Sequence, residues 1–156
     1  MKIFQLKINK HAKIYILTLF LLFIVFFPFS IFISLIFLIL LIFTVYFFRD
    51  PDRMVPVNSN LILSPADGII TFIDTFPAPK ELNIDNIEFN KVSIFLNIFN
   101  VHINRIPAEG KIVSVKYIKG KFLSATLDKS SEKNERNIIF MKTKNKNNLI
   151  FVQIAG

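Results

Sequence analysis

Apolar residues fill one continuous stretch near the N-terminus of this chain. No charged residue interrupts positions 14–48. A bilayer core takes roughly 20 helical residues, so the stretch is too long for one upright span and short for two. Pro28, closely followed by Ser30, marks a break. The pattern predicts two short helices, about Ile14–Phe27 and Ile31–Phe48, that form a hairpin in or across a membrane.

Basic residues flank this stretch on both sides. Lysines lie within the preceding segment 1–13, and Arg49 and Arg53 follow the stretch. The positive-inside rule then places both flanks, and the rest of the chain, on the cytoplasmic side of an inner membrane. A cleaved signal peptide is the competing interpretation. The stretch far exceeds an h-region of about 7 to 15 residues, and no small-residue cleavage site follows it.

Shorter runs follow the hairpin. Residues 49–60 are rich in proline, aspartate and asparagine and are expected to form a linker. Residues 61–156 carry β-rich runs, namely LILS, GIITFID, VSIFLNIF, KIVSVKYI and NLIFVQIA, with proline, glycine or asparagine and lysine between them. Only LDKSSEKNERN, residues 127–137, is polar enough to be a loop or one helical turn. The predicted fold class is mainly β, a small barrel or sandwich-like body behind a helical membrane hairpin.

Composition narrows the classes of function. Hydrophobic residues make up 53% of the chain, more than an ordinary soluble domain carries. The absence of cysteine excludes disulfides, thiol catalysis and cysteine metal sites. A net charge of +8 favours contact with anionic lipid. The sequence shows no alternation of aromatic and basic residues of the kind that would indicate a nucleic-acid partner.

Two residues of the β region are candidates for chemistry. Asp67 lies in SPADG, where an Asp-Gly turn often only caps its own backbone. His102, one of two histidines, can equally be a structural imidazole bonded to a carbonyl. Together they are more informative, because a carboxylate that orients a histidine lets the ring act as a general base. The serines lie in no nucleophile-elbow pattern, and two histidines without placed carboxylates predict no metal site.

Five sequence blocks resemble one known family. They are FFRDPDR at 47–53, SPADGII at 64–70, SIFLNIFNVHINRIPAEGKI at 93–112, GKFLSATLDKSSEKNER at 120–136 and FVQIAG at 151–156. Their order and approximate spacing resemble the short bacterial and archaeal form of phosphatidylserine decarboxylase. The similarity covers nearly the whole chain and includes the hydrophobic segment. Ser124 and Ser131 stand where the family pattern has Asn and Ala.

The resemblance implies a proenzyme of phospholipid biosynthesis. Family members cut themselves at a Gly-Ser bond and turn that serine into a pyruvoyl group. This cofactor takes up electrons as carbon dioxide leaves phosphatidylserine, which gives phosphatidylethanolamine. By motif match, His102 takes the proton of the serine and Asp67 orients the ring. The implied partners are the membrane phospholipid and a C-terminal chain that bears the pyruvoyl, and a homo-oligomer stays open.

The chain departs from the family pattern in one respect. It contains no Gly-Ser pair, and the family continues beyond its FVQIAG-like block before the processing site. The resemblance therefore places the pyruvoyl-forming serine beyond Gly156, the last residue of the sequence. We expect an N-terminal fragment with an incomplete β domain. As written, it should neither mature nor decarboxylate.

Arginines are candidates for binding the lipid phosphate or the serine carboxylate, because a guanidinium grips either group with two hydrogen bonds. The candidates are Arg49, Arg53, Arg105 and Arg136. The motif RDPDR can equally be an interfacial anchor, and Arg136 can be part of a surface ion pair. Two other functions stay open. One is a membrane-tethered phosphocarrier phosphorylated on His102, and the other is a non-catalytic lipid-binding remnant.

Overall fold

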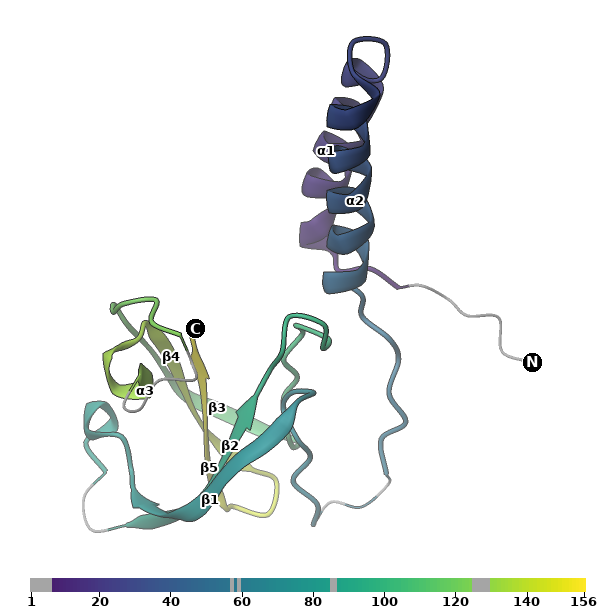
Figure 1. The fold of residues 1–156 in the computed structure, drawn as a ribbon. Helices are drawn as coiled ribbons and strands as arrows, with labels where there is room; N and C mark the ends of the chain where they lie inside the picture. Colours follow the sequence, from purple (N-terminus) through teal and green to yellow (C-terminus); the bar gives the residue numbers. More distant parts are fainter. Residues whose placement is uncertain (1–6, 57, 59, 85–86, 125–129) are drawn as a thin grey trace. The chain divides into compact units, whose positions relative to one another are not determined.

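A computed structural model describes residues 7–56, 58, 60–84, 87–124 and 130–156 (Figure 1). The chain divides into two compact units. The first, here called the helical unit, comprises residues 1–56, 66–68 and 96–104. The second, the β unit, comprises residues 57–65, 69–95 and 105–156. The block around LDKSSEKNER lies partly outside the described residues, because positions 125–129 are not among them.

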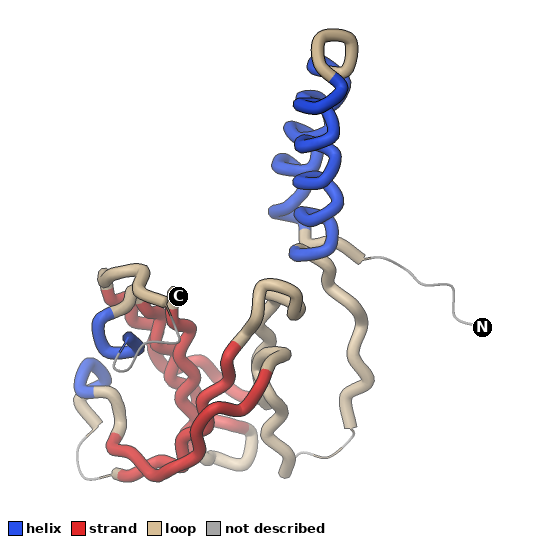
Figure 2. The backbone as a smooth tube through the Cα atoms, viewed as in Figure 1, coloured by secondary structure: helices blue, strands red, loops and turns tan. Residues whose placement is uncertain are grey.

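The helical unit is built on an antiparallel pair of helices, seen as the two blue coils that run side by side in Figure 2. A 3-10 turn, η1 (Lys10–Ala12), leads into α1 (Lys13–Phe26), and α2 (Ile31–Phe47) follows the Pro28 break. The hydroxyl of Ser30 accepts a hydrogen bond from the Ile33 N–H at 3.4 Å and so caps α2. The two predicted helices are therefore confirmed within a residue or two at each end.

The helix pair packs around one small polar residue. Ser34 is fully buried, and its hydroxyl donates a hydrogen bond to the Phe23 carbonyl of the other helix at 3.2 Å. The helices otherwise expose most of their large apolar side chains. Within the described residues, neither helix combines the length and the apolarity needed to cross a membrane. The transmembrane part of the prediction is therefore unsupported.

The β unit contains two antiparallel sheets. In the first, β1 (Ile69–Pro77) pairs with β2 (Glu88–Phe95). The second has the order β3 (Gly110–Ile118), β4 (Arg136–Thr143) and β5 (Asn148–Ile154). Short helical turns η2 (Lys80–Leu82) and α3 (Ser130–Lys133) lie in the connections. The mainly β class is confirmed, as is the helical turn expected within residues 127–137.

Two predicted strands differ from the observed ones. LILS, residues 61–64, forms no strand. Its Leu61 N–H donates to the Asn58 carbonyl, and its Leu63 N–H donates to the Pro107 carbonyl. VSIFLNIF ends as a strand at Phe95, because the asparagines beyond it close a turn. Conversely, the sequence interpretation named no strand at β4, since its NIIFM run follows directly on a polar segment.

The unrecognised strand β4 carries most of the buried apolar residues described in the β unit. Ile138, Ile139 and Met141 are all buried, with Ile138 completely inaccessible. A central strand is covered by a neighbour on each side, whereas edge strands are not. Accordingly, apolar residues on β1 and β3, such as Ile73 and Val115, stay exposed. The central position of β4 thus decides where the core lies.

Candidate active site

The loop that carries His102 begins with a closed turn. The Asn100 N–H donates to the Asn97 carbonyl at 2.8 Å, which closes the turn through the backbone. The side chains reinforce it, because the Asn97 N–H donates to Asn100 Oδ1 at 2.7 Å and the Phe99 N–H donates to Asn97 Oδ1 at 3.0 Å. Asparagine side chains favour such turns by replacing backbone partners. His102 therefore follows a rigid segment of the helical unit.

Two contacts fix the ring of His102. Its Nδ1 lies 3.2 Å from the Asn100 carbonyl oxygen, and the ring stacks on Phe47 with centroids 4.2 Å apart and planes 24° apart. A carbonyl oxygen can only accept, so the Nδ1 contact is favourable when Nδ1 carries the proton. The neutral ring then keeps its lone pair on Nε2. This is the tautomer that a general base needs.

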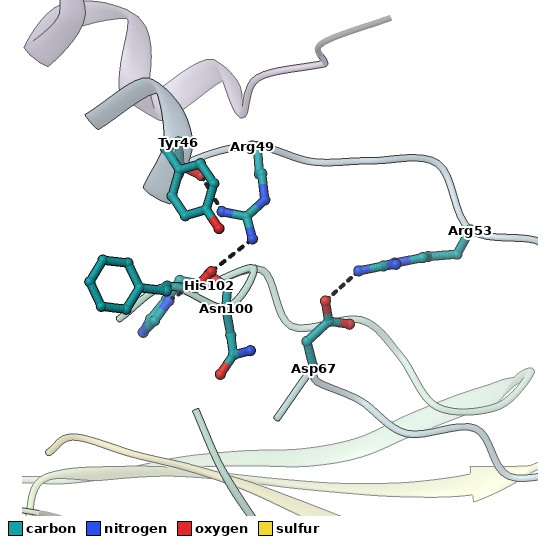
Figure 3. A network of polar contacts seen from close by, with 7 residues as sticks. Tyr46, Arg49, Arg53, Asp67, Asn100 and His102 are labelled. Carbon is teal, nitrogen blue, oxygen red and sulfur yellow. Dashed lines mark hydrogen bonds and ion pairs between the residues drawn. The ribbon is translucent and has the colours of Figure 1, made fainter. Parts of the chain in front are cut away.

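Arg49 joins the end of α2 to the same loop. Its guanidinium donates to the Tyr46 carbonyl at 2.7 Å and to the Phe99 carbonyl at 2.8 Å (Figure 3). The Cζ atom also lies 3.7 Å from the centroid of the Tyr46 ring, within the range of a cation–π contact. Arg49 and Phe47 therefore hold the histidine loop against the helix from two sides.

Asp67 has a different partner from the one that the sequence suggests. Figure 3 shows its carboxylate directed toward Arg53, with which it forms an ion pair. Both side chains are partly exposed, Arg53 at 44% and Asp67 at 36%. Gly68, which follows, has φ of 147°, a conformation that residues with a Cβ rarely adopt, and this lets the chain turn into β1. Among the described contacts, no hydrogen bond joins Asp67 to His102.

The remaining arginine candidates belong to the β unit. Arg136 pairs with Glu81 Oε1 at 2.5 Å and donates to the Glu132 carbonyl at 2.8 Å, with only 18% of its side chain exposed. A hydrogen bond from the backbone N–H of Glu81, followed by the one from Arg136, holds the pKa of that carboxyl below its ordinary value. The backbone N–H of Arg105 donates to the Pro65 carbonyl at 2.8 Å. Arg49 and Arg136 thus both use their guanidinium groups on protein acceptors.

Gly156 marks the point beyond which the sequence analysis places the pyruvoyl-forming serine. The structure places Gly156 in the β unit, exposed and two residues beyond the end of β5. His102 and Asp67 belong to the helical unit instead. Gly156 and the two site residues thus belong to different units, and the position of the serine stays a prediction.

Sequence reasoning missed the groups that orient the histidine. Phe47 was interpreted as part of an apolar run and of the block FFRDPDR, and Asn100 as part of another family block. The available signal was the pair of asparagines flanking two apolar residues in NIFN, which indicates a side-chain-closed turn. No sequence pattern indicated that Arg53 would pair with Asp67. Within the described residues, no three His, Asp or Glu side chains gather in a way that could hold a metal ion.

These observations define a mainly β protein with a helical pair, in which one unit carries a histidine stacked on a phenylalanine and an ion-paired aspartate. The family model of phosphatidylserine decarboxylase matches residues 40–156. The chain therefore belongs to the phosphatidylserine decarboxylase family. This result confirms the resemblance of the five blocks and removes the phosphocarrier alternative.

Individual relatives agree with the family match. Proteins named phosphatidylserine decarboxylase proenzyme from Rickettsia akari (strain Hartford) and Rickettsia bellii (strain OSU 85-389) are each 54% identical to the chain over 112 residues. The aligned region covers 72% of this chain and 48% of each relative. The chain thus spans about half the length of the curated relatives that it matches.

Proposed function

We propose that this chain works as part of a phosphatidylserine decarboxylase, which converts phosphatidylserine into phosphatidylethanolamine and carbon dioxide. The observation that carries the proposal is the family match over residues 40–156. Within this region, the contact of His102 Nδ1 with the Asn100 carbonyl favours the tautomer that a general base needs. The reaction belongs to phospholipid biosynthesis.

The proposed role of His102 is to take the proton from a serine hydroxyl as that oxygen attacks the preceding carbonyl carbon. The acceptor is Nε2, since Nδ1 contacts the Asn100 carbonyl. The ring becomes positively charged in this step, so a nearby carboxylate would stabilise it. Asp67 is the proposed carboxylate, and it would have to exchange its partner Arg53 for the imidazolium.

The proposed cofactor is a pyruvoyl group, whose carbonyl accepts the electrons released when the substrate loses carbon dioxide. The chain contains no Gly-Ser pair, so we propose that the serine comes from a segment beyond Gly156 or from a second polypeptide. The half-buried His102 and the ion-paired Asp67 are consistent with a serine supplied from elsewhere, because the proposed role of these two residues is proton transfer and not nucleophilic attack.

The proposed substrate is a membrane lipid, and the proposed location is the cytoplasmic side of an inner membrane. The exposed apolar side chains of the helix pair and the flanking lysines support this location. We further propose that the two sheets belong to a small barrel or sandwich, which exposed apolar residues on β1 and β3 support. Arg105 is the arginine proposed to meet the lipid headgroup, because it follows His102 closely in the same family block.

The test is a fusion of residues 1–156 to the part of the Rickettsia akari protein that lies beyond the matched region, produced in lipid vesicles. Mass spectrometry detects chain splitting and the pyruvoyl group, and carboxyl-labelled phosphatidylserine reports release of carbon dioxide. His102→Gln and Asp67→Asn should each slow self-cleavage by about 10²-fold to 10⁴-fold. His11→Gln and Asp74→Asn are the matched controls, since both residues are exposed.

The outcomes separate the parts of the proposal. A folded His102→Gln fusion that splits at the normal rate would overturn the role of His102, and the same holds for Asp67→Asn. A folded, unsubstituted fusion that releases no carbon dioxide would overturn the decarboxylase function.

A further inference from the structure

We propose that the turn Asn97–Asn100 and the end of α2 form one contact surface for an anionic phospholipid bilayer, with His102 at its rim. The inference deepens the proposed function and rests on its membrane location for the helix pair. It adds the turn as a further membrane contact beside the end of α2, and it assigns a depth to the histidine.

The turn presents two apolar side chains on a rigid support. Ile98 is 55% exposed and Phe99 is 60% exposed, although both lie between asparagines. The three hydrogen bonds that close the turn satisfy polar groups within it, at 2.7 to 3.0 Å. A preorganised tip needs no ordering on binding. Burying an aromatic or branched apolar side chain is favourable, so the two side chains together support a shallow insertion.

Arg49 sets the level of this tip relative to the helix pair. Its guanidinium lies over the Tyr46 ring and holds the Phe99 carbonyl at 2.8 Å. Tyrosine and arginine at the end of an apolar helix are typical of the membrane interface, where an amphipathic ring or a long cation meets the headgroups. Because Phe99 is hydrogen-bonded to that arginine, the tip lies at the interfacial end of the hairpin.

Charge at the same end favours an anionic surface. The segment before α1 pairs with the segment after α2, because the Asn9 N–H donates to the Phe48 carbonyl at 3.0 Å and the Asp50 N–H donates to the Lys7 carbonyl at 2.7 Å. This pairing brings the basic residues at both ends of the hairpin together. Lys10 and Lys13 are exposed there, and cations close to an anionic leaflet are attracted to it.

The depth of His102 follows from these contacts. Its ring stacks on Phe47, the last residue of α2, and its Nδ1 contacts the carbonyl of Asn100 in the turn. A ring held at this level meets the headgroups of lipids that stay in the bilayer. The surface therefore favours a membrane-resident diacyl phospholipid over a water-dispersed substrate.

The experiment uses tryptophan as a depth probe, because the chain contains none. The full chain with Phe99→Trp is reconstituted into vesicles of phosphatidylcholine and phosphatidylglycerol, with brominated acyl chains in a parallel set. We expect a blue shift of the emission and a loss of intensity with brominated lipid, together with protection from aqueous iodide. Adding Ile98→Asp to this variant should reduce all three effects, because it places a charge at the tip.

Two further probes make the result decisive. Tyr117→Trp is the matched control, since Tyr117 is 58% exposed in the β unit, and it should be quenched by iodide. Phe29→Trp, at the tip of the helix pair, should be quenched by brominated lipid. If Phe29→Trp responds to the lipid and Phe99→Trp responds only to iodide, the inference is overturned while the location of the hairpin stands. If neither responds to the lipid, the proposed membrane location fails and the inference fails with it. No outcome depends on decarboxylase activity.

Discussion

At the scale of single residues, Glu81 connects a short helical turn to the three-stranded sheet. Its carboxylate pairs with Arg136 of β4, and its backbone carbonyl accepts a hydrogen bond from Lys116 of β3. The pKa of Glu81 is lowered first by a hydrogen bond from its own backbone N–H, then by the hydrogen bond from Arg136. Arg136, a candidate for lipid binding in the sequence analysis, therefore has a structural partner in Glu81.

The lowered pKa of Glu81 predicts an acid-dependent loss of stability. A carboxyl whose pKa falls on folding stabilises the protein above its unfolded pKa, and this stabilisation is lost as the pH falls through the folded pKa. The free energy of unfolding should therefore decline below the ordinary value of 4.5. Glu81→Gln should be less stable at pH 7 and should show a flatter decline in acid, measured by urea unfolding in mild detergent.

Glu109→Gln is the control for this measurement. Glu109 pairs with Lys144, but both side chains are largely exposed, at 78% and 66%. Exposed pairs contribute about 0 to 1 kcal/mol, so this variant should keep the acid decline. An equally steep decline in Glu81→Gln would show that another group is responsible.

The side chain of Asn134 forms hydrogen bonds with backbone groups in place of backbone partners. It is completely buried, donates to the carbonyls of Leu123 and Ala155 at 2.7 and 2.6 Å, and accepts from the Leu123 N–H at 2.9 Å. Asn134→Ala leaves these buried groups unpaired, at roughly 1 to 3 kcal/mol for each. We expect the urea midpoint to fall with an unchanged slope. Asn137→Ala, which removes only an exposed bond to Gln153, should change stability by less than about 0.5 kcal/mol.

At the scale of elements, the end of α2 is the support of the histidine loop. Phe47 stacks on His102 while its neighbour Phe48 stacks on Tyr15, with the latter ring centroids 6.2 Å apart. Two adjacent residues at the end of α2 therefore stack on different rings, one in the histidine loop and one in α1. The helix pair does more than offer an apolar surface, because it also orients the residue proposed for proton transfer.

The stacked ring gives a spectroscopic prediction. A ring proton that faces an aromatic neighbour is shielded, so Phe47→Leu should move the His102 ring proton signals downfield in NMR spectra. Phe27→Leu should leave these signals in place, because its ring contact is with Phe23. His11→Gln assigns the resonances, since the chain has two histidines. Unchanged His102 shifts in Phe47→Leu would show that the stack does not persist in solution.

At the scale of the whole molecule, apolar surface is distributed unevenly. Large apolar side chains are exposed along both helices and on several strands. The net charge of +8 adds an attraction to anionic surfaces, which salt screens beyond about 8 to 10 Å. Apolar burial is not screened in this way, so the two contributions can be separated.

We therefore expect the full chain to stay with phospholipid vesicles in flotation at high salt and after alkaline carbonate. Ile39→Arg places a charge on an exposed position of α2, at about 2.5 to 3.5 kcal/mol in a bilayer centre, and should weaken this retention. Val115→Arg, on a similarly exposed position of β3, should not. Extraction of the unsubstituted chain by carbonate would contradict an inserted hairpin.

Several features could be predicted from the sequence because they are local. The uncharged run with Pro28 and Ser30 specified two helices and their break, since capping and helix interruption depend on adjacent residues. Alternating and β-branched runs specified β1, β3 and β5. The five motif blocks were enough for the family, because order and spacing are properties of the sequence itself.

Tertiary structure alone decided the partners of the site. Asp67 pairs with Arg53, and His102 lies between Phe47 and the Asn100 carbonyl. It also made β4 the central strand, which buries Ile138 although a polar segment directly precedes this strand. The physical reason is the same in each case. Backbone preference and hydrophobic period are set by nearby residues, whereas a side-chain contact depends on which distant segments the fold brings together.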